Sequence, residues 1–85
     1  MNNYKIIKMI TIYILSLNTQ KYKIILNDND TLNDMKNKYH EFCGIDPVCQ
    51  YLFFNKTYLD DDNKLIKDYG IFDNSIILHR LSQFI

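Results

Sequence analysis

An imidazole and two thiols lie close together in this sequence and are its first candidates for chemistry. His40 and Cys43 are three positions apart, and Cys49 lies six positions beyond Cys43. A cysteine nucleophile needs a neighbouring base, and a spacing of three on a helix brings two side chains onto one face. No group that would orient the base and no oxyanion-stabilising element accompanies them, so we predict no catalysis. A zinc site takes about four ligands, and these residues supply at most three.

An acidic run at residues 60–63, Asp-Asp-Asp-Asn, is the next candidate. A calcium loop of the EF-hand type spaces its ligands, has a central glycine and closes with a glutamate. The run lacks these features, which favours a solvated acidic turn. The chain's two glycines, Gly44 and Gly70, form no glycine-rich phosphate loop. We therefore expect no catalytic residue, metal or cofactor, and predict that the protein is not an enzyme.

Length and charge set the class of the protein. Its 85 residues suit one small domain. The formal net charge is +0 at pH 7, which gives no global electrostatic argument for a nucleic-acid or membrane partner. Two cysteines are fewer than a secreted domain of this size usually carries. We therefore expect free thiols in a reducing compartment, the cytoplasm and/or the nucleus.

The first apolar segment, residues 9–17, follows basic residues, as it would in a signal peptide. No small-x-small cleavage site follows, and the segment is much shorter than the ~20 residues of a membrane span. Its alternating pattern is typical of a strand and puts Ile10, Ile12 and Ile14 on one face. A polar turn leads into a second alternating segment at 21–26. We therefore predict a hairpin.

A helix is predicted next, with clear start and stop signals. Thr31 is suited to the N-cap, and Asp34 lies three positions later as its capping-box partner. Gly44 is suited to the left-handed C-cap. Lys36 belongs to the side predicted to face water. The apolar side chains recur at steps of three and four and so share one helical face: Leu32, Met35 and Tyr39.

Three further strands are predicted, at 51–54, 57–59 and 76–81, with a helical or 3₁₀ turn at 65–69 before the last. The order is strand, strand, helix, strand, strand, turn, strand. This order predicts an α+β fold, a five-stranded mixed sheet packed on one helix. We divide the chain into an N-terminal extension with the start of the first strand (1–9), one domain (10–81) and a short C-terminal tail (82–85).

A longer stretch carries a family resemblance: residues 44–78 read GIDPVCQYLFFNKTYLDDDNKLIKDYGIFDNSIIL. A Gly-Ile-x-Pro loop, a short apolar strand, an acidic turn after Leu59 and an Asp-Tyr-x-Ile turn follow in the order and spacing of the second half of ubiquitin. Upstream, residues 30–32, Asp-Thr-Leu, match the opening of ubiquitin's helix. The chain resembles the ubiquitin-like family as a divergent member, and the resemblance implies the β-grasp fold.

The resemblance also implies a surface that binds other proteins. Ubiquitin's apolar recognition patch combines a Leu from the first hairpin, an Ile from the third strand and a Val from the last strand. The matching residues are Leu17, Phe53 and His79. Tyr51 and Tyr58 stand where ubiquitin has an Arg and a Gln. Alternation turns Tyr51 and Phe53 away from the core, so we predict that these five residues form an aromatic, less basic docking surface.

The direction of His79 depends on the register of the last strand. Without a gap, Ile77 and His79 point inward, whereas a last turn shorter by one residue directs Ile76 and Leu78 inward. Burying Leu78 gains ~2 kcal/mol, whereas a buried neutral His79 needs a hydrogen-bond partner that the sequence does not identify. We therefore predict that His79 points outward, where its protonation near pH ~6.5 would weaken partner binding.

The tail separates two hypotheses of function. Ubiquitin is activated through a terminal Gly-Gly that passes through narrow enzyme channels, whereas residues 80–85 here read RLSQFI and no Gly-Gly occurs. The resemblance therefore favours a monomeric, non-conjugated module whose partners are proteins, either of the ubiquitin pathway or subunits of a complex. A covalently attached ubiquitin-like modifier is the alternative, and a structural subunit of a larger complex would share the docking mechanism.

Overall fold

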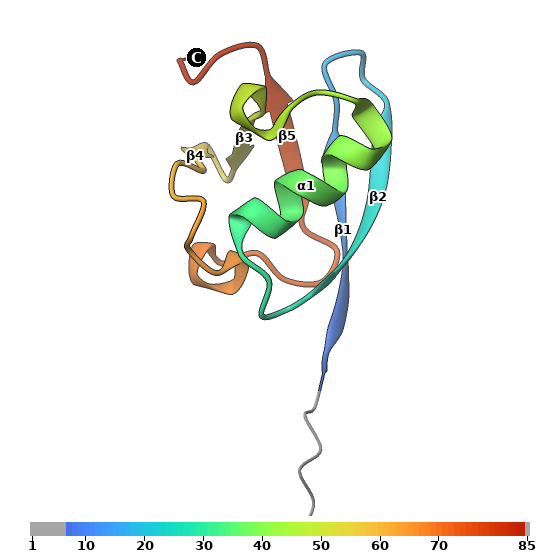
Figure 1. Cartoon of the computed structure of the whole chain (residues 1–85), viewed down its shortest axis with the longest axis vertical. Helices are drawn as coiled ribbons and strands as arrows, with labels where there is room; N and C mark the ends of the chain where they lie inside the picture. Colours follow the sequence, from blue (N-terminus) through green and yellow to red (C-terminus); the bar gives the residue numbers. More distant parts are fainter. Residues whose placement is uncertain (1–6, 85) are drawn as a thin grey trace, which may run out of the picture.

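Strands from both halves of the chain pair into one mixed sheet in the computed structural model, which describes residues 7–84. The elements are, in chain order, β1 (Met9–Leu15), β2 (Lys21–Asn27), α1 (Leu32–Cys43), η1 (Pro47–Cys49), β3 (Tyr51–Phe54), β4 (Thr57–Tyr58), η2 (Ile66–Tyr69) and β5 (Ile76–Arg80). The sheet order is β2-β1-β5-β3-β4, with β1 and β5 parallel and all other neighbours antiparallel. Figure 1 shows α1 lying across one face of the sheet. The predicted α+β fold, with five strands and one helix, is confirmed.

The predicted ends of the chain fall partly outside the described part. Residues 1–6 of the predicted extension 1–9 and Ile85 of the predicted tail are not among the described residues. Met9, which we assigned to the extension and the start of the first strand, already belongs to β1.

The core lies between α1 and the sheet face that it covers. Alternation along β1 and β2 directs one set of side chains inward, and Ile12, Ile14 and Ile24 are fully buried. Full burial of each such aliphatic side chain contributes about 1.5–3 kcal/mol. Phe54 and Tyr69 are only partly buried and pack against the edge of this core.

Both predicted helix caps are present in α1. The Thr31 hydroxyl accepts a hydrogen bond from the Asp34 amide at 3.2 Å, and the Asp34 carboxylate accepts one from the Thr31 amide at 2.9 Å. This reciprocal pair satisfies two amides that a helix N-terminus leaves without intrahelical partners. At the other end Gly44 has φ 74°, a left-handed conformation that glycine adopts without a Cβ penalty.

Lys36 does not face water, so the prediction that it lies on the solvent side of α1 is wrong. Its side chain is buried at 6% relative exposure, and its ammonium nitrogen lies 2.9 Å from a carboxylate oxygen of Asp62. The Asp62 carbonyl in turn accepts a hydrogen bond from the Asn33 amide. The acidic turn, whose residues 60–63 are all exposed as predicted, therefore also contacts the start of α1 through Asp62. The aliphatic stem of a lysine can be buried while its charge reaches a partner.

The register of β5 corrects the prediction that His79 points outward. Ile77 and His79 face the core, and Ile76, Leu78 and Arg80 face the opposite way. The hydrogen-bond partner that the sequence did not identify is Tyr39 of α1, whose hydroxyl oxygen lies 2.7 Å from His79 Nδ1. This contact satisfies the buried imidazole, so the energetic argument against the ungapped register does not apply.

Candidate functional site

The outer face of the sheet, opposite α1, carries a row of apolar side chains that crosses four strands. Leu15 on β1 pairs with Leu78 on β5, Leu78 is opposite Phe53 on β3, and Phe53 is opposite Tyr58 on β4. We call these four residues the outer row. Directly opposed residues on one face of a sheet are in side-chain contact distance. The register therefore assembles the row from segments that are far apart in the sequence.

Phe53 lies in the middle of the outer row but is not the exposed anchor that we predicted. Its relative exposure is 4%, because neighbouring side chains cover the ring. The Tyr58 ring centroid is 5.3 Å from that of Phe53. Phe53 also lines a crevice of about 300 Å³ together with Lys56, Leu78 and Arg80. Phe53 thus supports the surface from beneath, and a partner would meet Leu78, Tyr58 and the flanking cations first.

Tyr51 and Tyr58 occupy the β3–β4 side of this face. Both are partly buried, and their ring centroids are 6.4 Å apart. Burial, followed by the nearby Tyr51, Asp60 and Asp62, raises the pKa of the Tyr58 hydroxyl above its usual value. Tyr58 is therefore neutral at physiological pH and presents an aromatic ring with a hydroxyl donor, a combination favoured at protein interfaces.

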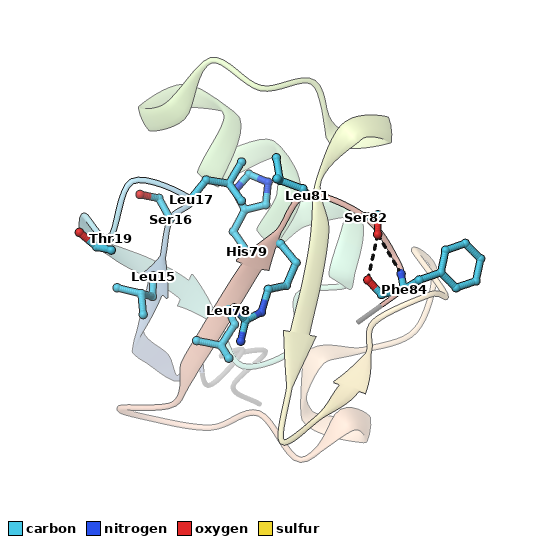
Figure 2. A pocket seen from close by; sticks show the side chains of 10 residues that line it. Leu15, Ser16, Leu17, Thr19, Leu78, His79, Leu81, Ser82 and Phe84 are labelled. Atoms are coloured by element: carbon cyan, nitrogen blue, oxygen red, sulfur yellow. Dashed lines mark hydrogen bonds between the residues drawn. The ribbon is translucent and has the colours of Figure 1, made fainter.

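Leu17 lies at the other end of the predicted surface, in the turn between β1 and β2. Its side chain is 44% exposed. Figure 2 shows it beside His79, at the edge of a crevice of about 360 Å³ whose walls also include Leu15, Leu78 and Arg80. His79 itself is 4% exposed, so it lines the inside of this crevice and does not belong to the exposed docking surface. The structure thus keeps Leu17, Tyr51 and Tyr58 accessible and buries Phe53 and His79.

Basic side chains border the outer row on β2, on β5 and at the β3–β4 turn, and sequence reasoning missed this basic border; Asp60 and Asp62 lie near the Tyr58 end of the row. The charged side chains on the five strands are all basic: Lys21 and Lys23 on β2 and Arg80 on β5. Lys56 joins them from the β3–β4 turn. The acidic residues of the described chain lie in α1, the 3₁₀ turns and the loops. The net charge of +0 is therefore the sum of a basic sheet face and an acidic remainder.

The apolar surface continues along β1 and β5 beyond the outer row. Tyr13 is paired with Ile76, whose side chain is half exposed. The Lys21 ammonium lies 4.8 Å from the centre of the Tyr13 ring, a cation–π contact. Ile25 on β2 adds a further exposed aliphatic side chain. Contiguous exposed apolar area of this kind marks interaction surfaces in soluble proteins.

The residues first considered for chemistry lie in the second half of α1 and in η1. Cys43 is partly buried, Cys49 is exposed, and both thiols are free. His40 Nε2 lies 3.8 Å from an Asp46 carboxylate oxygen. Within residues 7–84, no three His, Cys, Asp or Glu side chains group closely enough to hold a metal ion. None of the helices in that range is sufficiently long and apolar to cross a membrane.

Comparison with known proteins supplies one positive finding. The model of the ubiquitin family matches residues 11–84, which is nearly the whole of the described chain. No curated protein matches the sequence significantly. The matched span begins within β1, at residue 11, and includes every later element up to β5, and with them the outer row and its basic border.

Proposed function

This chain belongs to the ubiquitin family, and on that premise we propose that it is a non-enzymatic, non-conjugated module that binds proteins through the outer face of its sheet. Domains of the family are in general protein-binding modules. The observation that carries the proposal is the outer row: Leu15, Leu78, Phe53 and Tyr58 form one apolar surface with cations around it. We include Leu17 and Tyr51 at its edges, since both are accessible.

The charge around the outer row defines the kind of partner that fits it. The apolar centre is flanked by four cations, Lys21, Lys23, Lys56 and Arg80, and no carboxylate lies on the described strands. Acidic groups approach it only from the loop after β4, where Asp60 and Asp62 lie near Tyr58. Opposite charges across an interface accelerate association, and like charges exclude wrong partners. An apolar centre with a charged rim is the usual anatomy of a protein interface. We therefore propose that the partner presents apolar side chains flanked by Asp or Glu.

A selection from a random peptide library displayed on phage tests this partner chemistry. The immobilised protein is expected to enrich peptides that combine large apolar residues with carboxylates, and their binding is expected to weaken as salt is raised. The double variant Lys56→Glu/Arg80→Glu, altered only at exposed positions, is expected to lose the acidic preference. Enrichment of basic or uncharged peptides by the unaltered protein would contradict the proposal, as would a failure to enrich any.

The segment after β5 supports the non-conjugated part of the proposal. Leu81, Ser82, Gln83 and Phe84 follow the strand, and the only glycines of the sequence cap α1 and η2. Incubated with ubiquitin-activating enzyme and ATP, the chain is expected to form no thioester, because bulky side chains occupy the segment that must pass a channel fitted to glycine. Ubiquitin in the same reaction is the positive control. A thiol-sensitive adduct of this chain on a non-reducing gel would instead favour the modifier hypothesis.

A further inference from the structure

Tyr39 and His79 form a buried polar pair that joins α1 to β5. The Tyr39 hydroxyl oxygen and His79 Nδ1 are 2.7 Å apart, and the two rings meet edge to face with centroids 5.3 Å apart. Tyr39 is fully buried, and His79 is 4% exposed. A buried hydrogen-bonded pair is stable while both groups are neutral, but a charge at this position would need a partner.

The β1–β2 turn, residues 16–20, covers this pair. One crevice of about 360 Å³ and another of about 230 Å³ open beside it, and Ser16, Leu17 and His79 line both. Figure 2 shows Leu17 next to the His79 ring in the larger crevice. A small movement of Ser16 and Leu17 would therefore join the two crevices and admit water to His79.

The turn is held by exposed hydrogen bonds within residues 16–20. Asn18 Oδ1 accepts from the Ser16 hydroxyl and the Gln20 amide, and the Asn18 carbonyl accepts from the Thr19 hydroxyl. The Ser16 amide donates to the Gln20 carbonyl at 2.8 Å, and the Thr19 amide donates to the Ser16 carbonyl at 3.0 Å. Thr19 has φ 66°, a left-handed conformation that is unfavourable for a β-branched residue. A segment with exposed hydrogen bonds and a strained residue opens more easily than the core beneath it.

The surroundings of His79 offer no counter-charge. The titratable or charged groups that line the two crevices with it are Tyr22 from β2, Tyr39 and Cys43 from α1, and Arg80 from β5. Leu52 of β3 is opposite His79 in the sheet, and no carboxylate lines either crevice within the described residues. Burial lowers the pKa of His79 below its ordinary value. An imidazolium would thus have no carboxylate partner among the residues that line the crevices, and Arg80 among them carries a like charge.

We propose that the β1–β2 turn is a proton-controlled flap: protonation of His79 favours an open turn, in which water reaches the Tyr39–His79 pair and Leu17 leaves the edge of the docking surface. The opening does not depend on the proposed function, whereas its effect on docking rests on it. Opening takes up a proton, because the closed turn disfavours the charged imidazole. The open fraction is therefore constant above pH ~6.5, the ordinary pKa of histidine, and rises by up to about tenfold for each pH unit below it.

Amide hydrogen exchange followed by NMR tests the flap in the free protein. The measurements run from pH 7.5 to pH 5, a range that spans the ordinary histidine pKa of about 6.5. Protection factors remove the intrinsic pH dependence of exchange. The Ser16 and Thr19 amides are expected to lose protection on acidification by several-fold, on the order of the tenfold limit per pH unit. The Met35 and Ile66 amides, hydrogen-bonded to Thr31 and Asp30 far from the turn, report global opening and are expected to keep their protection.

Three variants identify the titrating group. His79→Gln can still hydrogen-bond to Tyr39 but takes up no proton, so its turn protection is expected to be independent of pH. His79→Leu serves the same purpose if the glutamine variant does not fold. His40→Gln removes the other histidine, which is on the surface of α1, and is expected to behave as the unaltered protein does.

Three results would each overturn the flap. The first is constant turn protection in the unaltered protein between pH 7.5 and pH 5, a range placed around the ordinary histidine pKa of about 6.5. The second is an equal pH-dependent loss in His79→Gln or His79→Leu. The third is a parallel loss at the turn and reference amides, which would show global unfolding. If instead the flap opens as proposed but peptide affinity is the same in its open and closed states, only the coupling to docking fails.

Discussion

Leu52→Ala is expected to lower the free energy of unfolding by about 2–5 kcal/mol. Leu52 is fully buried on the α1 side of β3, opposite His79, and its carbonyl accepts a hydrogen bond from the Leu59 amide. Truncation removes apolar contacts and leaves a cavity beside the Tyr39–His79 pair. Domains are stable by only about 5–15 kcal/mol, and small ones have smaller cores, so this loss is a large fraction of the total.

Urea denaturation of the two proteins measures this difference directly. Val48→Ala is the matched control, since Val48 is 85% exposed and its truncation is expected to change stability by no more than about 0.5 kcal/mol. A loss below about 1 kcal/mol for Leu52→Ala would mean that Leu52 does not face a packed core. The two faces of β3 would then be wrongly assigned, and the outer row with them.

The strands and the helix were predictable because their signals are local. The isoleucines at 10, 12 and 14 alternate with other residues, and alternation alone determines which side chains share a face of a strand. Thr31, Asp34 and Gly44 mark the helix ends through contacts within one turn of chain. These contacts depend on neighbours in sequence, so the sequence is sufficient to predict them.

The three corrected residues depend on partners that are distant in sequence. His79 is buried because the Tyr39 hydroxyl, 40 positions away, lies within hydrogen-bond distance. Lys36 is buried because Asp62 receives its ammonium group from the loop before η2. Phe53 is covered by side chains of β4 and β5, the two strands that pair with β3 on either side. Residue type and periodicity do not predict these contacts between residues that are distant in the sequence.

The basic border was accessible from the sequence in principle. Lys21 and Lys23 alternate with the inward residues of β2, so the strand pattern already places both on the outer face. Arg80 has the same orientation once the register of β5 is known. The net charge of +0 concealed this separation because it averages over the whole chain. Charge counted separately for each face of the sheet is the more informative quantity.

Leu78→Asp is expected to weaken binding of peptides selected on the unaltered protein by about 30-fold or more, the effect of losing a central hot-spot residue worth about 2 kcal/mol. Leu78 lies between Leu15 and Phe53 in the outer row and lines the crevices at both ends of it. The new carboxylate would remove the apolar centre and repel the acidic groups of the partner. Leu78 is only partly buried and points away from the core, so the variant is expected to fold.

The affinity of one selected peptide for Leu78→Asp, measured by calorimetry, is the most direct test of the outer face as the docking site. Val48→Asp introduces the same charge at an exposed aliphatic residue outside the strands and is the matched control. Thermal unfolding of both variants verifies that each remains folded. We predict loss of binding for Leu78→Asp and unchanged binding for Val48→Asp. Unchanged affinity in a folded Leu78→Asp protein, or an equal loss in Val48→Asp, would contradict docking through the outer face of the sheet.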